Sequence, residues 1–219
     1  MTQSEQPPRA STPRPTPPRR KIALALTGAS GAPYFLRCLE RLRGRDDVEL
    51  HLVASEGGKR VLHDELGMKW SEVETRGCIV HPLKNIGASI ASGSFGLEAL
   101  VVVPCSMSTL SAISVGLAEN LVHRAAAVQL KESRRLILVP RETPLSLINL
   151  RAMVTLREAG AVIMPASPGF YQQPETVTDL VDTVVDRIID HLQLADETIF
   201  RWNPQPGAIK NQLRREEST

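Results

Sequence analysis

The sequence predicts a single α/β domain in which a doubly wound parallel sheet lies between two layers of helices. Short apolar runs alternate with longer amphipathic segments along most of the chain, which has 219 residues and is 42% hydrophobic. The apolar runs are continuous rather than alternating, as is typical of strands buried on both faces. The length suits one ordinary domain with a sizeable core. Together these observations predict a three-layer fold of the Rossmann/flavodoxin-like type.

The expected elements follow each other in a strand-then-helix rhythm. We expect strands at 22–27, 48–55, 99–106, 135–142 and 161–168, where the apolar runs lie. We expect helices at 32–44, 57–66, 108–117, 123–132, 144–160 and 175–192, in the longer segments between and after them. Pro33 suits the first turn of the first helix, because the N–H that proline lacks has no partner there.

The domain is expected to span residues 21–202, with a tail at each end. Residues 1–20 are rich in proline and arginine and lack an apolar run, so we expect a disordered segment rather than a signal peptide. A transit peptide is the minority alternative for this segment. Residues 203–219 are polar and are expected to form a loose tail.

Charge, apolar content and cysteine use exclude several classes of protein. The formal net charge is +2, and most of the positive excess lies in residues 1–21, so the body of the chain is nearly neutral and broad binding to nucleic acid is not expected. The apolar runs fall well short of the roughly 20 residues that cross a bilayer, so we expect no membrane span. Cys38, Cys78 and Cys105 match neither a disulfide framework nor paired zinc ligands. We therefore expect a cytoplasmic protein without a metal site.

In a doubly wound sheet the ligand site lies beyond the carboxyl ends of the strands, which directs attention to the segments that follow each run. The first is GASGA at 28–32, where small residues separate a strand from a helix. Unpaired N–H groups and the positive end of a helix dipole attract an anion such as phosphate at such a turn. The motif is neither a full G-x-G-x-x-G nor a Walker loop, so a tight turn with a purely conformational role is an equal alternative.

A second cluster, PCSMSTL at 104–110, places three hydroxyl groups near the start of a helix. Ser106, Ser108 and Thr109 are suited either to capping the helix or to binding a phosphate. Cys105 has no histidine placed beside it by the sequence, so we interpret it as a small buried residue and not as a nucleophile.

The third cluster is cationic. Arg124 and Lys131 are seven residues apart, which puts them on the same face of a helix, and Arg141 and Glu142 follow the next strand. Several cations at one pocket predict an anionic substrate, with arginine suited to bidentate phosphate contact. Solvated helix charges and a structural Arg–Glu pair are the alternative for each residue taken alone.

Taken together, the stretches TGASGA, ASIASGSF, VVVPCSMSTL, HRAAAVQLKE, VPRETPLSLINLRAM and GAVIMPASPGFYQQP resemble the flavin prenyltransferase family, within the larger group of flavin-binding, cysteine-decarboxylase-like proteins. The resemblance covers nearly all of residues 21–202. It implies a homododecamer that attaches a dimethylallyl group from dimethylallyl monophosphate to N5 and C6 of reduced FMN. It also implies that the product, prenylated FMN, serves a partner decarboxylase, as in ubiquinone biosynthesis.

The resemblance also implies roles for individual residues. FMN would be held by Gly28, Ala29, Ser30, Ser55, Ser106, Met107, Ser108, Thr109 and Arg141. The prenyl phosphate would be surrounded by Ser92, Gly93, Arg124, Lys131, Arg141, Tyr171 and Arg187, several of them from neighbouring subunits. The catalytic residues would be Ser30, Glu65, Lys131, Glu142 and Trp202. Ser108 stands where many family members carry a basic residue.

The implied chemistry assigns each of these groups a task. Lys131 and three arginines would neutralise the departing phosphate without a metal, and Glu142 would pass a proton between N5 and that phosphate with help from Ser30. Glu65 would assist the removal of the proton from C6. Trp202 would offer a π face to an allylic cation, or else anchor the tail by packing. His123 matches no catalytic position and is interpreted as structural.

Two rival functions are compatible with the same fold. A flavin-dependent cysteine-type decarboxylase on the same fold would need a histidine near the first helix, and no histidine occurs in residues 1–50. A non-enzymatic FMN-binding module for storage or redox sensing is the second alternative.

Overall fold

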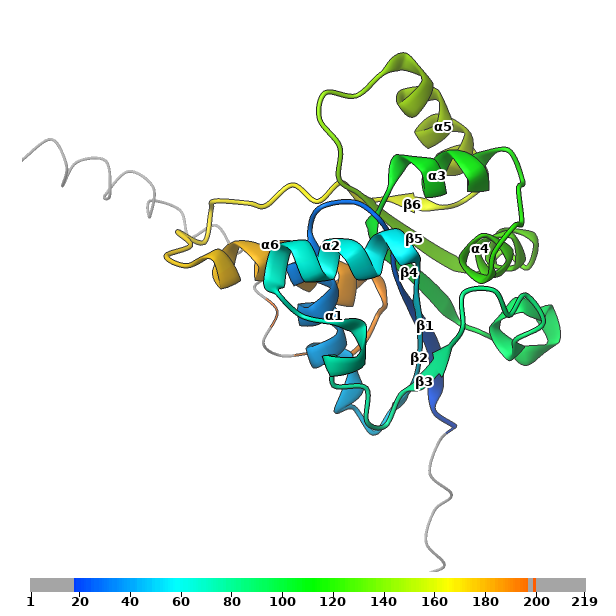
Figure 1. Cartoon of the computed structure of the whole chain (residues 1–219), viewed down its shortest axis with the longest axis horizontal. Helices are drawn as coiled ribbons and strands as arrows, with labels where there is room; N and C mark the ends of the chain where they lie inside the picture. The colour runs from blue at the N-terminus through cyan, green and yellow to red at the C-terminus, as the bar shows by residue number, and fades with distance from the viewer. Residues whose placement is uncertain (1–17, 197–198, 200–219) are drawn as a thin grey trace, which may run out of the picture.

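Six parallel strands form one twisted sheet in the computed structural model, which describes residues 18–196 and residue 199 (Figure 1). The strand order is β3-β2-β1-β4-β5-β6. The chain therefore moves outward from β1 in one direction through β2 and β3, and then returns to the other side of β1 for β4, β5 and β6. This order confirms the predicted doubly wound α/β fold.

The strands and helices lie close to the predicted segments. The strands are β1 (Arg20–Leu26), β2 (Val48–Ala54), β3 (Ile79–His81), β4 (Ala99–Cys105), β5 (Arg135–Pro140) and β6 (Val162–Ile163). The helices are α1 (Ala32–Arg43), α2 (Glu56–Leu66), α3 (Met107–Ser114), α4 (Leu121–Lys131), α5 (Leu147–Glu158) and α6 (Val177–His191). Short 3₁₀ turns at Trp70–Glu72, Ser89–Ala91 and Gly93–Phe95 flank β3 and lead into β4.

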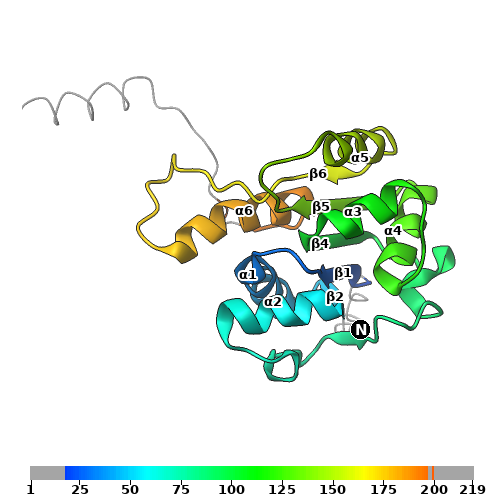
Figure 2. The same cartoon turned by 45° about the horizontal axis from the view of Figure 1, so that its top comes forward.

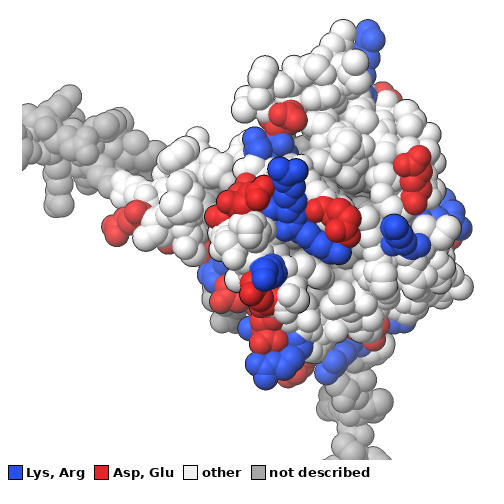
Figure 3. Space-filling model, in the orientation of Figure 1, with Lys and Arg blue, Asp and Glu red and all other residues white. Residues whose placement is uncertain are grey.

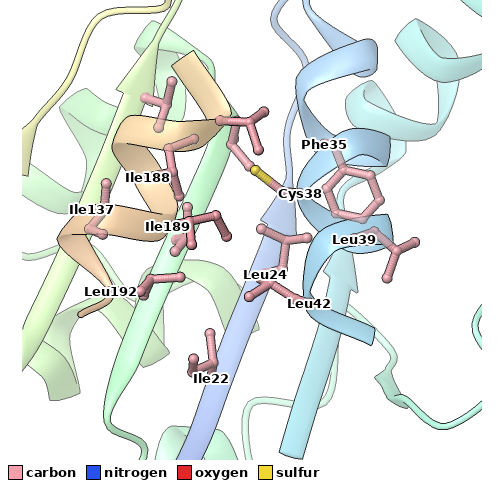
Figure 4. Packing of buried hydrophobic residues seen from close by; sticks show 14 of the residues in the cluster. Ile22, Leu24, Phe35, Cys38, Leu39, Leu42, Ile137, Ile188, Ile189 and Leu192 are labelled. Atoms are coloured by element: carbon pink, nitrogen blue, oxygen red, sulfur yellow. The ribbon is translucent and has the colours of Figure 1, made fainter. Parts of the chain in front are cut away.

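The helices cover the two faces of the sheet in equal number, which gives the three predicted layers. Helices α1, α2 and α6 pack on one face and α3, α4 and α5 on the other (Figure 2). On the first face, side chains of β1 and β5 interlock with those of α1 and α6 (Figure 4). Phe35 and Leu42 of α1 and Leu24 of β1 are wholly buried there, and each such burial stabilises the fold by roughly 1.5–3 kcal/mol.

Two strands differ from the expectation. The short edge strand β3 was not predicted, because only three residues form it and Ile79 and Val80 are exposed. It pairs with β2 through the main chain, and His81 Nε2 also lies 2.9 Å from Nδ1 of the buried His51 on β2, a contact that a hydropathy pattern does not reveal.

The last strand is much shorter than the predicted 161–168, because Pro140, which lies opposite on β5, has no N–H to donate back to it. The N–H of Ala166 still donates to the carbonyl of Pro140 at 2.9 Å beyond it. This edge of the sheet therefore ends as an extended segment, not as a regular strand.

Candidate functional site

The carboxyl ends of β2, β1, β4 and β5 lie side by side, so the segments that follow them form one surface at the edge of the sheet. The winding of the chain reverses between β1 and β4, and in open α/β sheets ligands bind at that point. All the residues expected to hold a flavin lie in these segments or in the helix turns that they begin. The sequence-based grouping of these segments is therefore correct within one subunit.

The glycine turn after β1 is set by close contact with the loop after β2. A Cβ on Gly28 would lie 3.2 Å from Cα of Gly57, and one on Gly57 would lie 3.1 Å from Cα of Gly28. Gly31 has a φ of +125°, which side chains rarely tolerate. Glycine thus supplies the dihedral angles and the close approach that this turn needs, while Gly28 and Ser30 are exposed beside it.

The start of α1 is already occupied by an acidic side chain of the same subunit. The N–H of Gly31 donates to both carboxylate oxygens of Glu65, at 3.1 and 3.0 Å, and the N–H of Ala32 donates to Oε2 at 2.8 Å. The helix dipole adds to this attraction. An anion expected at the first glycine turn would have to compete with Glu65, so α3 offers the more open helix start.

The first turn of α3 carries the predicted hydroxyl cluster. Ser106 Oγ accepts a hydrogen bond from the N–H of Thr109 at 3.3 Å and lies 3.1 Å from Ser108 Oγ and 3.0 Å from Thr109 Oγ1. Ser108 is exposed, whereas Ser106 and Thr109 are buried. Capping and ligand binding are compatible here, because the Ser106 cap leaves the N–H groups of Met107 and Ser108 without intrahelical partners. Ser55 caps α2 in the same way, accepting from the N–H of Gly58 at 3.0 Å.

Arg141 links the end of β5 to the glycine turn. Its Nε donates to the carbonyl oxygen of Ser30 at 3.2 Å, across the intervening strand β4. The neighbouring Glu142 is exposed, and its Oε1 accepts from the N–H of Thr143 at 3.1 Å. The structure thus brings Ser30, Arg141 and Glu142 to the same edge, with no Arg141–Glu142 ion pair among the bonds it describes.

Lys131 lies elsewhere, at the end of α4 that leads into β5 and therefore at the amino edge of the sheet. Its Nζ lies 3.2 Å from Oε1 of Glu132, and a Cβ on Gly93 would overlap that same oxygen. Ser92 precedes Gly93, and its hydroxyl lies 3.0 Å from Ser94 Oγ. Three residues of the expected phosphate site, Ser92, Gly93 and Lys131, are thus neighbours at this edge.

The remaining members of the expected phosphate site do not join this group within one subunit. Arg124 is exposed one turn into α4, the helix that also carries Lys131, whereas Arg187 is exposed on α6 on the opposite face of the sheet. Arg187 Nη1 pairs with Asp190 at 2.8 Å and borders a pocket of about 420 Å³ beside β6. Tyr171, in the segment between β6 and α6, is 84% exposed. Trp202 lies outside the described residues.

The other chemical features of the described chain are modest. On the face shown in Figure 3, lysines and arginines are interspersed with acidic residues. The described residues include no group of three or more His, Cys, Asp or Glu side chains suited to a metal ion, and no described helix is long and apolar enough to span a membrane.

Burial agrees with the structural interpretation of two residues. Burial raises the pKa of the Cys105 thiol, which disfavours the nucleophilic thiolate. His123 is buried on α4, and burial lowers its pKa, so it stays neutral there.

One buried side chain of the site was not singled out from the sequence. Thr27, the last residue before the glycine turn, is 1% exposed, and its hydroxyl bonds both to Pro104 and to Ser106. A threonine at the end of an apolar strand is too common to attract notice from the sequence. Its neighbours across the sheet are what distinguish it.

The comparisons with known proteins agree with this geometry. A family model described as flavoprotein matches residues 10–189. A probable UbiX-like flavin prenyltransferase of Streptomyces sp. (strain D7) is 47% identical over 182 residues, which are 83% of this chain and 91% of that relative. The chain belongs to the flavin prenyltransferase family. The resemblance inferred from the motifs is therefore confirmed.

Solved structures of flavin prenyltransferase relatives share the fold closely. AnUbiX (PadA1) in complex with FMN and dimethylallyl pyrophosphate is 42% identical, with a TM-score of 0.80, over 85% of this chain and 99% of that one. A dodecameric FMN-dependent UbiX-like decarboxylase from Escherichia coli O157:H7 is also 42% identical, with a TM-score of 0.80, over 84% of this chain and 100% of that one. The cysteine decarboxylase TvaF from thioviridamide biosynthesis is only 16% identical, with a TM-score of 0.52, which is a likeness of fold alone.

Proposed function

We propose that this flavin prenyltransferase transfers the dimethylallyl group of dimethylallyl monophosphate to N5 and C6 of reduced FMN and releases prenylated FMN. The observation that carries the proposal is the match to AnUbiX, which binds FMN and a dimethylallyl pyrophosphate and shares 42% of its residues over nearly its whole length. The cysteine-type decarboxylase and the FMN-binding module have no comparable support.

The carboxyl edge of the sheet suits a flavin. Exposed Gly28 and Ser30 leave backbone open to a flat ring, and the first turn of α3 supplies N–H and hydroxyl donors for a phosphate. We assign FMN binding to these residues together with Ala29, Ser55, Ser106–Thr109 and Arg141. The bound reduced flavin supplies the nucleophilic positions of the reaction.

The phosphate of the donor must be stabilised as it leaves, because a monophosphate is a poor leaving group. We assign this task to Lys131, Arg124, Arg141 and Arg187, with Ser92, Gly93 and Tyr171 completing the pocket. Cations aimed at the developing charge lower the barrier without help from a metal. Because Lys131 and Arg187 lie on opposite faces of one subunit, the complete pocket in this proposal is shared between subunits.

Two carboxylates have separate tasks in the proposed reaction. Glu142 is exposed at the flavin edge and is assigned the transfer of a proton to the departing phosphate, assisted by Ser30. Glu65 is oriented by the N–H groups of Gly31 and Ala32 and is assigned the removal of the proton from the flavin ring. Trp202 is assigned to the allylic fragment through its π face.

We also infer the setting in which the enzyme works. The dodecameric relative from Escherichia coli supports a dodecamer of this chain. The free cysteines of the described residues are consistent with a cytoplasmic location, and a decarboxylase that depends on prenylated FMN is the inferred recipient of the product.

The direct test is an anaerobic incubation of the protein with reduced FMN and dimethylallyl monophosphate, followed by mass spectrometry of the extracted flavin. We expect a flavin heavier by one dimethylallyl group. Dimethylallyl alcohol, which has no phosphate to leave, serves as the control and should give unmodified FMN. Recovery of FMN alone with the phosphate donor would contradict the proposal.

A further inference from the structure

We infer that Thr27 is a positioning residue of the flavin site, because its buried hydroxyl holds the two cofactor loops, after β1 and after β4, in a fixed relation. Its Oγ1 donates to the carbonyl oxygen of Pro104 at 2.8 Å and accepts from the N–H of Ser106 at 2.8 Å. Thr27 is 1% exposed, so no solvent replaces these bonds. The inference rests on the proposed FMN site.

The main chain does not hold the two loops together at this level. The paired residues of β1 and β4 run from Ile22 with Ala99 to Ala25 with Val102 and end there. The register between β4 and β5 also shifts between Val102 and Cys105. The Thr27 hydroxyl thus connects β1 and β4 at the point where their regular pairing stops and the loops begin.

Each end of this connection leads to a residue of the proposed flavin site. Thr27 directly precedes Gly28, and its carbonyl accepts from the N–H of Ala29 at 2.9 Å. At the other end, the Thr27 hydroxyl accepts a hydrogen bond from the N–H of Ser106. The Ser106 hydroxyl in turn caps α3 and contacts Ser108 and Thr109. Losing the Thr27 hydroxyl would leave the buried N–H of Ser106 without its acceptor and free the α3 start to shift relative to the glycine turn.

The test compares two substitutions at this position. Thr27→Val keeps the shape and removes the hydroxyl, and Thr27→Ser keeps the hydroxyl and removes the methyl. We expect Thr27→Val to raise the Kd for FMN on the order of tenfold, as expected for lost hydrogen bonds at a buried site. We expect Thr27→Ser to stay within about twofold of the wild type. Flavin fluorescence titration of the apoprotein gives both values.

Thr183 provides a matched control on α6. Its hydroxyl also accepts from a loop N–H, that of Gly169 at 3.1 Å, and donates to a carbonyl, that of Leu180 at 2.7 Å, but it lies away from the loops after β1 and β4. Thr183→Val should therefore leave the Kd for FMN unchanged. The KM of the prenyl donor at saturating FMN should stay near the wild-type value in Thr27→Val.

Several outcomes would overturn the inference. They are wild-type FMN affinity in folded Thr27→Val, equal losses in Thr27→Val and Thr27→Ser, or an equal loss in Thr183→Val. If Thr27→Val does not fold, Thr27→Ala takes its place: FMN affinity equal to that of Thr27→Ser would overturn the inference, and a loss of affinity in the alanine variant alone would support it. A wild-type protein that binds no FMN would instead remove the proposed function itself.

Discussion

At the scale of single residues, two carboxylates at the carboxyl edge of the sheet have different surroundings. The Glu65 carboxylate accepts hydrogen bonds from two N–H groups at the start of α1. Glu142 is exposed and, among the described bonds, accepts a hydrogen bond only from the neighbouring N–H of Thr143. The N–H donors hold the Glu65 carboxylate in one orientation, as suits a group aimed at a fixed position of the flavin ring. The exposure of Glu142 leaves room beside it for the phosphate of the donor, which suits the proton transfer proposed for this residue.

The proton role of Glu142 makes a specific prediction. Glu142→Gln keeps an oxygen for the Thr143 N–H but has no titratable proton, so FMN affinity should remain within about twofold while turnover falls roughly 10²-fold or more. Fluorescence titration and product analysis by mass spectrometry measure the two effects. Glu40→Gln, an exposed substitution on α1, is the control and should change neither. Normal turnover in Glu142→Gln rules out the proton role.

At the scale of secondary structure, the packing of α2 against β1 depends on one glycine. A Cβ on Gly58 would lie 2.6 Å from the carbonyl oxygen and 2.8 Å from the carbonyl carbon of Leu26, so main-chain atoms would have to shift to admit it. Helix α2 also carries Glu65 to the start of α1. A shift of α2 relative to β1 would therefore move Glu65 at the candidate site.

We predict that Gly58→Ala lowers the free energy of unfolding by about 1–3 kcal/mol, the usual cost of overpacking a tight site. Gly44→Ala is the control, because a Cβ on Gly44 meets nothing within 4 Å and its φ is −89°. That variant should be as stable as the wild type or slightly more so. Urea denaturation of both proteins measures the difference, and equal midpoints would show that α2 can shift freely.

Most of the strands and helices could be predicted from the sequence. The long buried strands and the amphipathic helices were predictable, because burial on both faces gives continuous apolar runs and burial on one face gives a helical stripe. β3 was not predictable, because it has only three residues and two of them, Ile79 and Val80, are exposed. The rule that ligands bind beyond the carboxyl ends of parallel strands also placed Ser30, Ser55, Ser106 and Arg141 at one edge of the sheet.

The rest of the site depends on contacts between distant segments. The engagement of Glu65 with Gly31 and the bonds of Thr27 to Pro104 and Ser106 join loops that are far apart in the chain. Hydropathy and spacing report which face a residue occupies but not which loop it meets. These contacts therefore required the structure.

At the scale of the whole molecule, α5 presents an apolar face to solvent. Leu147, Leu150 and Val154 are 61%, 44% and 56% exposed, and they lie on the side of α5 opposite the buried Ala152 and Leu156. Contiguous apolar surface of this kind marks protein–protein contacts. With the dodecameric relative, it supports α5 as part of the proposed subunit interface.

We predict that Val154→Glu weakens self-association, because a charge on this face would have to be buried in the interface. Glutamate is a better helix former than valine, so α5 itself should not be destabilised. Light scattering coupled to size-exclusion chromatography should show smaller species than the wild type. His63→Glu adds the same charge to an exposed position of α2 and serves as the control, and an unchanged mass of Val154→Glu would contradict the assignment.

The placement of Lys131 and Arg187 on opposite faces of a single subunit has a genetic consequence. If each phosphate pocket takes its lysine from one subunit and its arginine from another, two inactive variants can complement each other. Lys131→Ala and Arg187→Ala homo-oligomers should both bind FMN yet lose affinity for the prenyl donor. Hybrid particles from co-expression of the two should contain some intact pockets and regain part of the activity. Hybrids no more active than either parent would mean that one polypeptide supplies both cations.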